Sequence, residues 1–312
     1  MNEVFKKICN MSQFAVKKHV TEKLKETYSD VFSGDGFVFA KGTFPVLLVA
    51  HMDTVHDQLP GVILYDVQKD AMSSPNGIGG DDRCGVYMIL EVIKHYNCSV
   101  LFCEDEEIGA IGASKFIETD LARELSFNYI IEFDRKGKND AVFYDCDNED
   151  FEDFITSDFY NAAYGTFSDI SVIAPFLKCA AVNLSCGYYS AHTKQEYVVL
   201  SEMERSIEEA CKILEKTTEK DKFEYIESKW SGYNWKGNGY KSNGFYDWGN
   251  GYESEDYVFD YYYLIEYYDR DNKTKWYDTY ATSEAEAVGK LLMEKSTLCY
   301  NNIIDILVDK GY

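Results

Sequence analysis

The chain has 312 residues, of which 46% are hydrophobic, so it is long enough and apolar enough to bury a sizeable core. Its formal net charge of −23 repels phosphate backbones and no lysine and arginine cluster offsets it, so nucleic acid is not an expected partner. No stretch approaches the roughly 20 apolar residues of a membrane span, and nine cysteines without CxxC spacing indicate reduced thiols in a cytoplasmic protein.

Strands and helices are predicted to alternate over the first 220 residues. Residues 2–27 have the apolar spacing of an amphipathic helix, with a break near Thr21. Residues 31–40 and 46–50 form a strand pair that turns at Lys41-Gly42, and a hairpin-like stretch follows over 61–79. The other expected elements are helix 82–96, strand 99–103, helix 110–125, strands 129–133 and 140–145, helices 149–157 and 168–177, strand 180–186 and helix 200–217.

This alternation predicts an α/β domain over residues 1–220, with a mixed, mostly parallel central sheet and helices on both faces. Continuous apolar runs are typical of strands that are buried on both faces of a parallel sheet. Four expected strands are such runs, namely those within 46–50, 99–102, 129–131 and 181–184.

The composition shifts after this domain. Residues 221–312 hold all four tryptophans and 15 of the 26 tyrosines, which indicates a separate unit. Residues 221–255 are rich in glycine, asparagine and aromatic residues and predict a linker. Residues 256–312 predict a small α+β domain of unknown role, with strands at 257–268, 274–281 and 303–308 and a helix at 283–295.

Candidate metal ligands follow the predicted strands. His51 and Asp53 lie two residues apart after strand 46–50, so they face the same side in extended geometry, and Asp53 can orient the ring of His51. Asp81 and Asp82 follow two glycines, where a carboxylate can bridge two cations. Taken alone, a helix N-cap with a first-turn acid explains that pair more simply.

Further acids and a histidine follow the later strands. Glu106 and Glu107 end a run of four acids after strand 99–103, Asp134 ends strand 129–133, and His192 lies in a loop beyond strand 180–186. A solvated turn is the simpler reading of the acidic run alone. Carboxyl ends of parallel strands meet at one edge of a sheet, so together these side chains predict a site for two divalent metal ions. His56 is close enough to His51 to serve as a spare ligand or a substrate contact.

Four segments resemble the motifs of the co-catalytic zinc exopeptidases, and the last is especially similar to the tripeptidase T group. They are HMDTV at 51–55, GDDRCG at 80–85, DEEIG at 105–109 and GYYSAHTKQEYV at 187–198. The resemblance covers about residues 30–215. It implies that His51 and Asp134 bind one zinc, that Glu107 and His192 bind the other, and that Asp81 bridges them.

The resemblance also implies catalytic roles. Glu106 would be the general base for a water bridged by the two metals, and Asp53 would orient His51. Two divalent ions are implied, with zinc expected and cobalt or manganese compatible with the same ligand types. Residues 165–169 resemble the family's glycine and serine-aspartate segment beside the substrate pocket. Weaker candidates for substrate contacts are Ser168, Asp169, His56 and Arg135.

One departure from the family pattern concerns an inserted domain. Many relatives carry a lid or dimerisation domain between the aspartate ligand and the final histidine. Here only 58 positions separate Asp134 from His192, and only 30 separate His51 from Asp81. Neither gap can hold such a domain, so any side chain that a relative's lid contributes is missing from that place.

The leading functional prediction is a metal-dependent exopeptidase of the aminopeptidase or tripeptidase type that hydrolyses short peptides. An amidohydrolase that deacylates N-acyl amino acids is the alternative within enzymes, because the chemistry is the same and the pocket decides. A catalytically silent binding protein on the same fold is the third hypothesis, and the intact Glu106 argues against it. The sequence leaves the oligomeric state open.

Overall fold

The computed structural model describes residues 2–228, 261–268, 273–281, 291 and 303–309. The chain divides into two compact units, Met1–Asn234 and Trp235–Tyr312. Each unit has a sheet of its own, and the first unit carries the candidate site. Among the helices of the described ranges, none is both long and apolar enough to cross a membrane.

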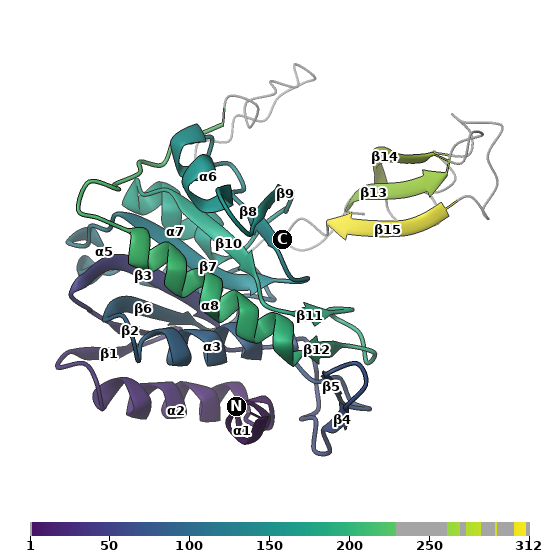
Figure 1. Cartoon of the computed structure of the whole chain (residues 1–312), viewed down its shortest axis with the longest axis horizontal. Coiled ribbons are helices and arrows are strands. Elements are labelled where there is room, and N and C mark those ends of the chain that lie inside the picture. Colours follow the sequence, from purple (N-terminus) through teal and green to yellow (C-terminus); the bar gives the residue numbers. More distant parts are fainter. Residues whose placement is uncertain (1, 229–260, 269–272, 282–290, 292–302, 310–312) are drawn as a thin grey trace, which may run out of the picture. The chain divides into compact units, whose positions relative to one another are not determined.

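An eight-stranded sheet forms the centre of the first unit (Figure 1). Its strands run in the order β1-β2-β6-β3-β7-β10-β8-β9, and the four strands β6, β3, β7 and β10 are mutually parallel. These four are the apolar runs of the sequence, so the mixed, mostly parallel sheet is confirmed. The strands are β1 (Val31–Gly34), β2 (Phe37–Ala40), β3 (Phe44–His51), β6 (Cys98–Cys103), β7 (Tyr129–Arg135), β8 (Asp140–Val142), β9 (Asn161–Ala163) and β10 (Ala181–Ser185).

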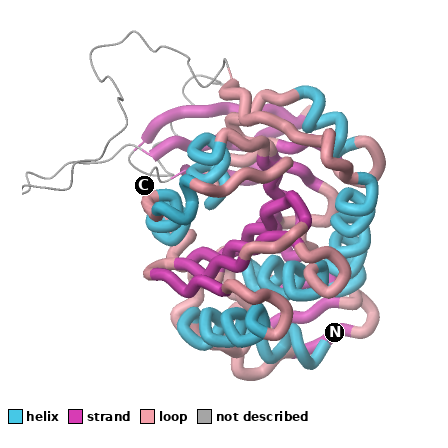
Figure 2. Tube along the Cα trace, turned by 90° about the vertical axis from the view of Figure 1, so that its left-hand side faces the viewer, coloured by secondary structure: helices cyan, strands magenta, loops and turns pink. Residues whose placement is uncertain are grey.

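Helices cover both faces of this sheet, as the tube in Figure 2 also shows. Each face has its own apolar core, because side chains alternate between the two faces along every strand. The larger core lies under α1 (Asn2–Cys9), α2 (Gln13–Lys25), α3 (Gly80–Val92), α6 (Glu149–Thr156) and α8 (Leu200–Lys216). The smaller core lies under α4 (Ile111–Ile117), α5 (Asp120–Arg123) and α7 (Asp169–Leu177).

A second, antiparallel sheet in the first unit has the order β11-β12-β5-β4. Its strands are β11 (Tyr188–Tyr189), β12 (Tyr197–Val199), β5 (Ala71–Ser73) and β4 (Leu64–Asp66). Strands β4 and β5 confirm the hairpin expected within 61–79. Because β12 pairs with β5, the sheet joins the segment that leads to Asp81 to the loop that carries His192.

Three local predictions were wrong. The first helix breaks at residues 10–12 and not near Thr21, because the Ser12 hydroxyl caps α2 by accepting a hydrogen bond from the N–H of Ala15. The turn at 41–42 does not join paired strands, because β6 lies between β2 and β3. The helix expected over 110–125 is two helices, and Thr119 caps the second.

The second unit contains the antiparallel sheet β14-β13-β15, formed by β13 (Tyr261–Tyr268), β14 (Thr274–Ala281) and β15 (Ile303–Asp309). These strands confirm the three expected in this part of the chain, and the helix expected over 283–295 lies outside the described residues apart from residue 291. Most of the predicted linker also lies outside them. Its first residues, 221–228, pair with the first unit through the bridges Cys179–Glu224 and Cys146–Glu227.

Candidate metal centre

The candidate ligands converge from five segments of the first unit. Strand β3 ends at His51, α3 begins beside Asp81, and β7 carries Asp134 near its end. Glu107 follows β6, and His192 lies in the loop between β11 and β12. Parallel strands place their carboxyl ends at one edge of the sheet, which explains why residues so distant in sequence meet here.

The first group consists of His51, Asp81 and Asp134, whose ligand atoms lie within 4.8 Å of one another. The Nε2 atom of His51 lies 3.1 Å from Oδ1 of Asp81 and 3.4 Å from Oδ1 of Asp134. Its other ring nitrogen, Nδ1, lies 3.0 Å from Oδ1 of Asp53. Asp53 therefore fixes the ring and leaves Nε2 to face the two carboxylates.

The second group consists of Asp81, Glu107 and His192, again within 4.8 Å of one another. The Nε2 atom of His192 lies 3.1 Å from Oδ2 of Asp81 and 3.2 Å from Oε2 of Glu107. The other oxygen of Glu107, Oε1, is buried and has no hydrogen-bond partner among the residues that the structure describes. Asp81 thus belongs to both groups and contributes a different oxygen atom to each.

These residues fit a pair of divalent cations. When Nδ1 of His51 carries the proton that it donates to Asp53, Nε2 presents its lone pair to two carboxylate oxygens. The lone pair and these oxygens repel one another unless a cation or a proton lies between them. Among the described residues, the ion pairs of the ligand carboxylates are all with histidines and none is with lysine or arginine. Burying such a charge unpaired costs on the order of several kcal/mol, and bound cations would offset this cost by neutralising the carboxylates.

Further hydrogen bonds hold the ligands in place. The carboxylate of Asp53 accepts hydrogen bonds from the backbone N–H groups of Glu106 and Glu107, at 3.0 and 3.1 Å, and so fixes the acidic loop against His51. The hydroxyl of the buried Tyr188 donates to Asp134, with its oxygen 3.0 Å from the carbonyl oxygen and 3.3 Å from Oδ1. Such supporting bonds are a common feature of metal sites.

Burial and neighbouring charges shift the protonation of the site. Burial raises the pKa of Glu106 to about 8, and the carboxylates of Asp134 and Glu107 add to this effect while His51 opposes it. Burial also acts to raise the pKa of Asp81, but the hydrogen bonds with His192 and His51 lower it overall. Glu106 belongs to neither ligand group, so its carboxylate stays free to accept a proton, and it lies in the same cluster of charges as the ligand groups.

The remaining candidates belong to neither ligand group. Ser168 and Asp169 are fully buried at the start of α7, and the Ser168 hydroxyl donates to Glu132. Arg135 donates to Asp140 at 3.2 and 3.3 Å. His56 belongs to neither ligand group and lies 2.9 Å from Glu196.

Sequence reasoning assigned no role to Tyr188 or Glu196, although both lie in the quoted segment 187–198. Each lies four residues from His192, and both are almost completely buried. The signal was an acid and a tyrosine close to a histidine predicted to bind metal, which a search for side chains that support ligands would have found.

Metal binding is expected to release protons and to strengthen as pH rises. Without a cation, the hydrogen bonds with Asp81 and Glu107 raise the pKa of His192 to about 11, and burial with the Asp81 charge raises the pKa of Asp134 to about 7. Both groups must lose a proton to bind a cation, so affinity should rise by about tenfold per pH unit for each proton displaced. Calorimetry between pH 6 and 8 in two buffers measures this, and a pH-independent affinity contradicts it.

Comparisons with known proteins identify the fold. No family model matches the chain, and no curated protein matches it in sequence. The aminopeptidase PepT of Bacillus cereus superimposes with a TM-score of 0.56 at 15% identity over 68% of this chain and 96% of its own. An aminopeptidase of Desulfurococcus kamchatkensis gives 0.54 at 16% identity over 70% and 95%, and a tripeptidase of Staphylococcus aureus gives 0.52 at 14% over 67% and 95%. The fold is that of the zinc exopeptidases.

The zinc exopeptidase fold occurs here without a separate inserted domain between Asp134 and His192. This stretch forms β8, α6, β9, α7, β10 and β11, which belong to the two sheets and the helix layers of the first unit. The short gap predicted this arrangement.

Proposed function

We propose that this protein is a metal-dependent exopeptidase that removes residues from the amino terminus of short peptides. The observation that carries the proposal is Asp81, which offers one carboxylate oxygen to His51 and Asp134 and the other to Glu107 and His192. Zinc is the expected ion, and cobalt or manganese would suit the same ligands. Two bound cations would polarise the scissile carbonyl and lower the pKa of an attacking water.

The protein's own residues would move the proton. Glu106 accepts the proton of the attacking water and then donates it to the leaving amine, so that the peptide bond is replaced by a carboxylate and a free amine. Its raised pKa, about 8 before cations bind, would fall as they neutralise the neighbouring carboxylates. Asp53 holds both the ring of His51 and the backbone N–H of Glu106, which fixes the position of the base relative to the ligands.

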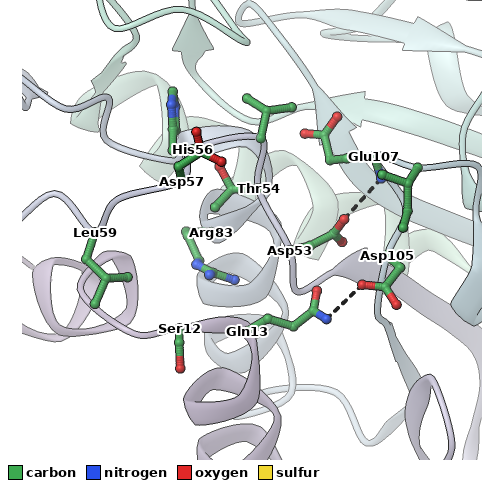
Figure 3. Close-up of a pocket in the computed structure, with 12 residues that line it drawn as sticks. Ser12, Gln13, Asp53, Thr54, His56, Asp57, Leu59, Arg83, Asp105 and Glu107 are labelled. Carbon is green, nitrogen blue, oxygen red and sulfur yellow. Dashed lines mark hydrogen bonds between the residues drawn. The ribbon is translucent and has the colours of Figure 1, made fainter.

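The adjoining cavity supports recognition of a free amine. A cavity of about 640 Å³ lies beside Glu107, and four acids line it. Both arginines near the site already have partners: the terminal nitrogens of Arg83 donate to the carbonyls of Met52 and Met11, and Arg135 donates to Asp140. Figure 3 shows the acids Asp53, Asp105 and Glu107 on one side of this cavity and His56, Asp57 and Leu59 on the other.

This charge pattern favours an aminopeptidase over a deacylase of N-acyl amino acids, because the latter needs a cation for the free carboxylate of its substrate. Metal-loaded protein should release the first residue of di- and tripeptides, and acetylation of the amine should block release. Chromatography of the products measures both. Hydrolysis of N-acetyl amino acids with free peptides left intact would support the deacylase instead, and neither reaction with two ions bound would support a binding role.

A further inference from the structure

Glu196 is a carboxylate with no solvent exposure, four residues beyond His192. Its Oε1 atom accepts a hydrogen bond from the backbone N–H of Asp81 at 3.0 Å, and its Oε2 atom accepts one from the N–H of Gly79 at 2.7 Å. The same Oε2 lies 2.9 Å from Nε2 of His56. One buried side chain therefore joins the segment after His51, the turn before α3 and the loop of His192.

The turn that presents Asp81 has a demanding geometry. Gly79 has a φ of +66°, and a Cβ atom on Gly80 would lie 2.8 Å from Val198 and 2.9 Å from Tyr188. Asp81 must direct one oxygen to each ligand group, so a small rotation of this turn would withdraw one of them. The two N–H groups held by Glu196 are the backbone of this turn, and fixing them fixes the direction of the Asp81 side chain.

We propose that Glu196 is a positioning residue that sets the Asp81 carboxylate between the two ligand groups and, through His56, aligns one wall of the adjoining cavity. The inference rests on the proposed two-metal function, because the direction of Asp81 matters most if it holds two ions. Glu196 acts through the backbone of Asp81 and through the His56 ring, which lines the cavity (Figure 3).

The chemistry of this contact requires a carboxylate. A carboxylate accepts hydrogen bonds on both oxygens and donates none, which suits two backbone N–H groups and the imidazole N–H of His56. In Glu196→Gln the side chain keeps its length, but its NH₂ group must face at least one of these donors. That donor loses its acceptor, and the turn shifts. Loss of a supporting contact typically weakens metal binding by about 10–100-fold, and both ions should be affected because Asp81 serves both.

The test compares zinc affinity and backbone protection in wild type, Glu196→Gln and the control Glu209→Gln. Glu209 is similarly buried, on α8, and pairs with Arg205 and Lys212 at 2.5 and 2.9 Å, so its substitution controls for the loss of a buried carboxylate. Competition with a chelator should show zinc binding about 10–100-fold weaker in Glu196→Gln alone. Amide hydrogen exchange in the metal-free proteins should be faster at Gly79 and Asp81 in Glu196→Gln alone, which requires neither metal nor activity.

A further variant tests separately the two roles proposed for Glu196, which are fixing the turn of Asp81 and aligning His56. His56→Ala should leave zinc affinity unchanged, because the bonds from Glu196 to Gly79 and Asp81 remain. It should raise KM, because the His56 ring lines the cavity. Wild-type zinc affinity and unchanged amide exchange in Glu196→Gln would overturn the inference. Should that variant fail to fold, Glu196→Asp, which is one methylene shorter, replaces it with the same two readouts. Two bound ions without peptide cleavage in wild type would overturn the proposed function, and the affinity comparison would still decide the role of Glu196.

Discussion

Replacing Glu106 with glutamine should lower kcat by about 10²–10⁴-fold while the protein still binds two metal ions, the range expected when a general acid–base group is lost. Glutamine has the same shape and cannot accept a proton from water. Because Glu106 lies outside both ligand groups, its loss should leave the metal content intact. Steady-state hydrolysis of a tripeptide, with metal counted in the same samples, measures both quantities.

Glu104 provides the matched control, because it belongs to the same acidic run but pairs with Lys17 at 2.5 Å. Glu104→Gln should keep near wild-type kcat. Equal activity of Glu106→Gln and wild type would remove Glu106 from the mechanism. A parallel loss of metal in Glu106→Gln would mean that this residue is a ligand and that the base lies elsewhere.

Asp81→Ala should weaken binding of both ions by more than about 100-fold, a larger effect than loss of a supporting residue, and should abolish hydrolysis. The reason is that each oxygen of Asp81 belongs to a different ligand group, so one substitution removes a ligand from both. Metal content after dialysis against a weak chelator measures the effect, and thermal unfolding of the metal-free protein shows whether the variant folds.

His192→Ala is the comparison for Asp81→Ala. His192 belongs to the second group only, so its loss should weaken one ion and leave the one beside His51. If Asp81→Ala also lost a single ion, the carboxylate would not be shared, and a one-metal site would replace the two-metal account.

The sheet could be predicted from the sequence because its central strands are buried on both faces. Continuous apolar runs such as 46–50 and 129–131 have few other places in a globular fold. The candidate ligands followed from the same fact, since polar residues just after such strands gather at one edge of the sheet. His51 and Asp134 lie at that edge, on neighbouring strands β3 and β7.

Strand order and supporting contacts could not be predicted, because both depend on packing between distant segments. Strand β6 lies between β2 and β3, although the turn at 41–42 favoured pairing of the strands on either side of it. The position of Glu196, four residues after His192, marks it as a candidate supporting side chain but does not indicate what it binds, because its partners lie 115 and 117 residues away. Only the folded chain brings these groups together.

The helix break at residues 10–12 shows how a local contact overrides apolar spacing. The break was predicted near Thr21, but the Thr21 hydroxyl donates to the carbonyl of Lys17 within a continuous helix. The Ser12 cap instead begins a new helix, α2, at Gln13. This turn brings Gln13 to the cavity, where its amide donates to Asp105 at 2.9 Å.

We expect one chain to hold two metal ions around Asp81, which anomalous diffraction from zinc-loaded crystals would show directly. Two anomalous peaks should lie on either side of this carboxylate, one in contact with His51 and Asp134 and the other with Glu107 and His192. A single peak, or two peaks that do not share Asp81, would contradict this expectation.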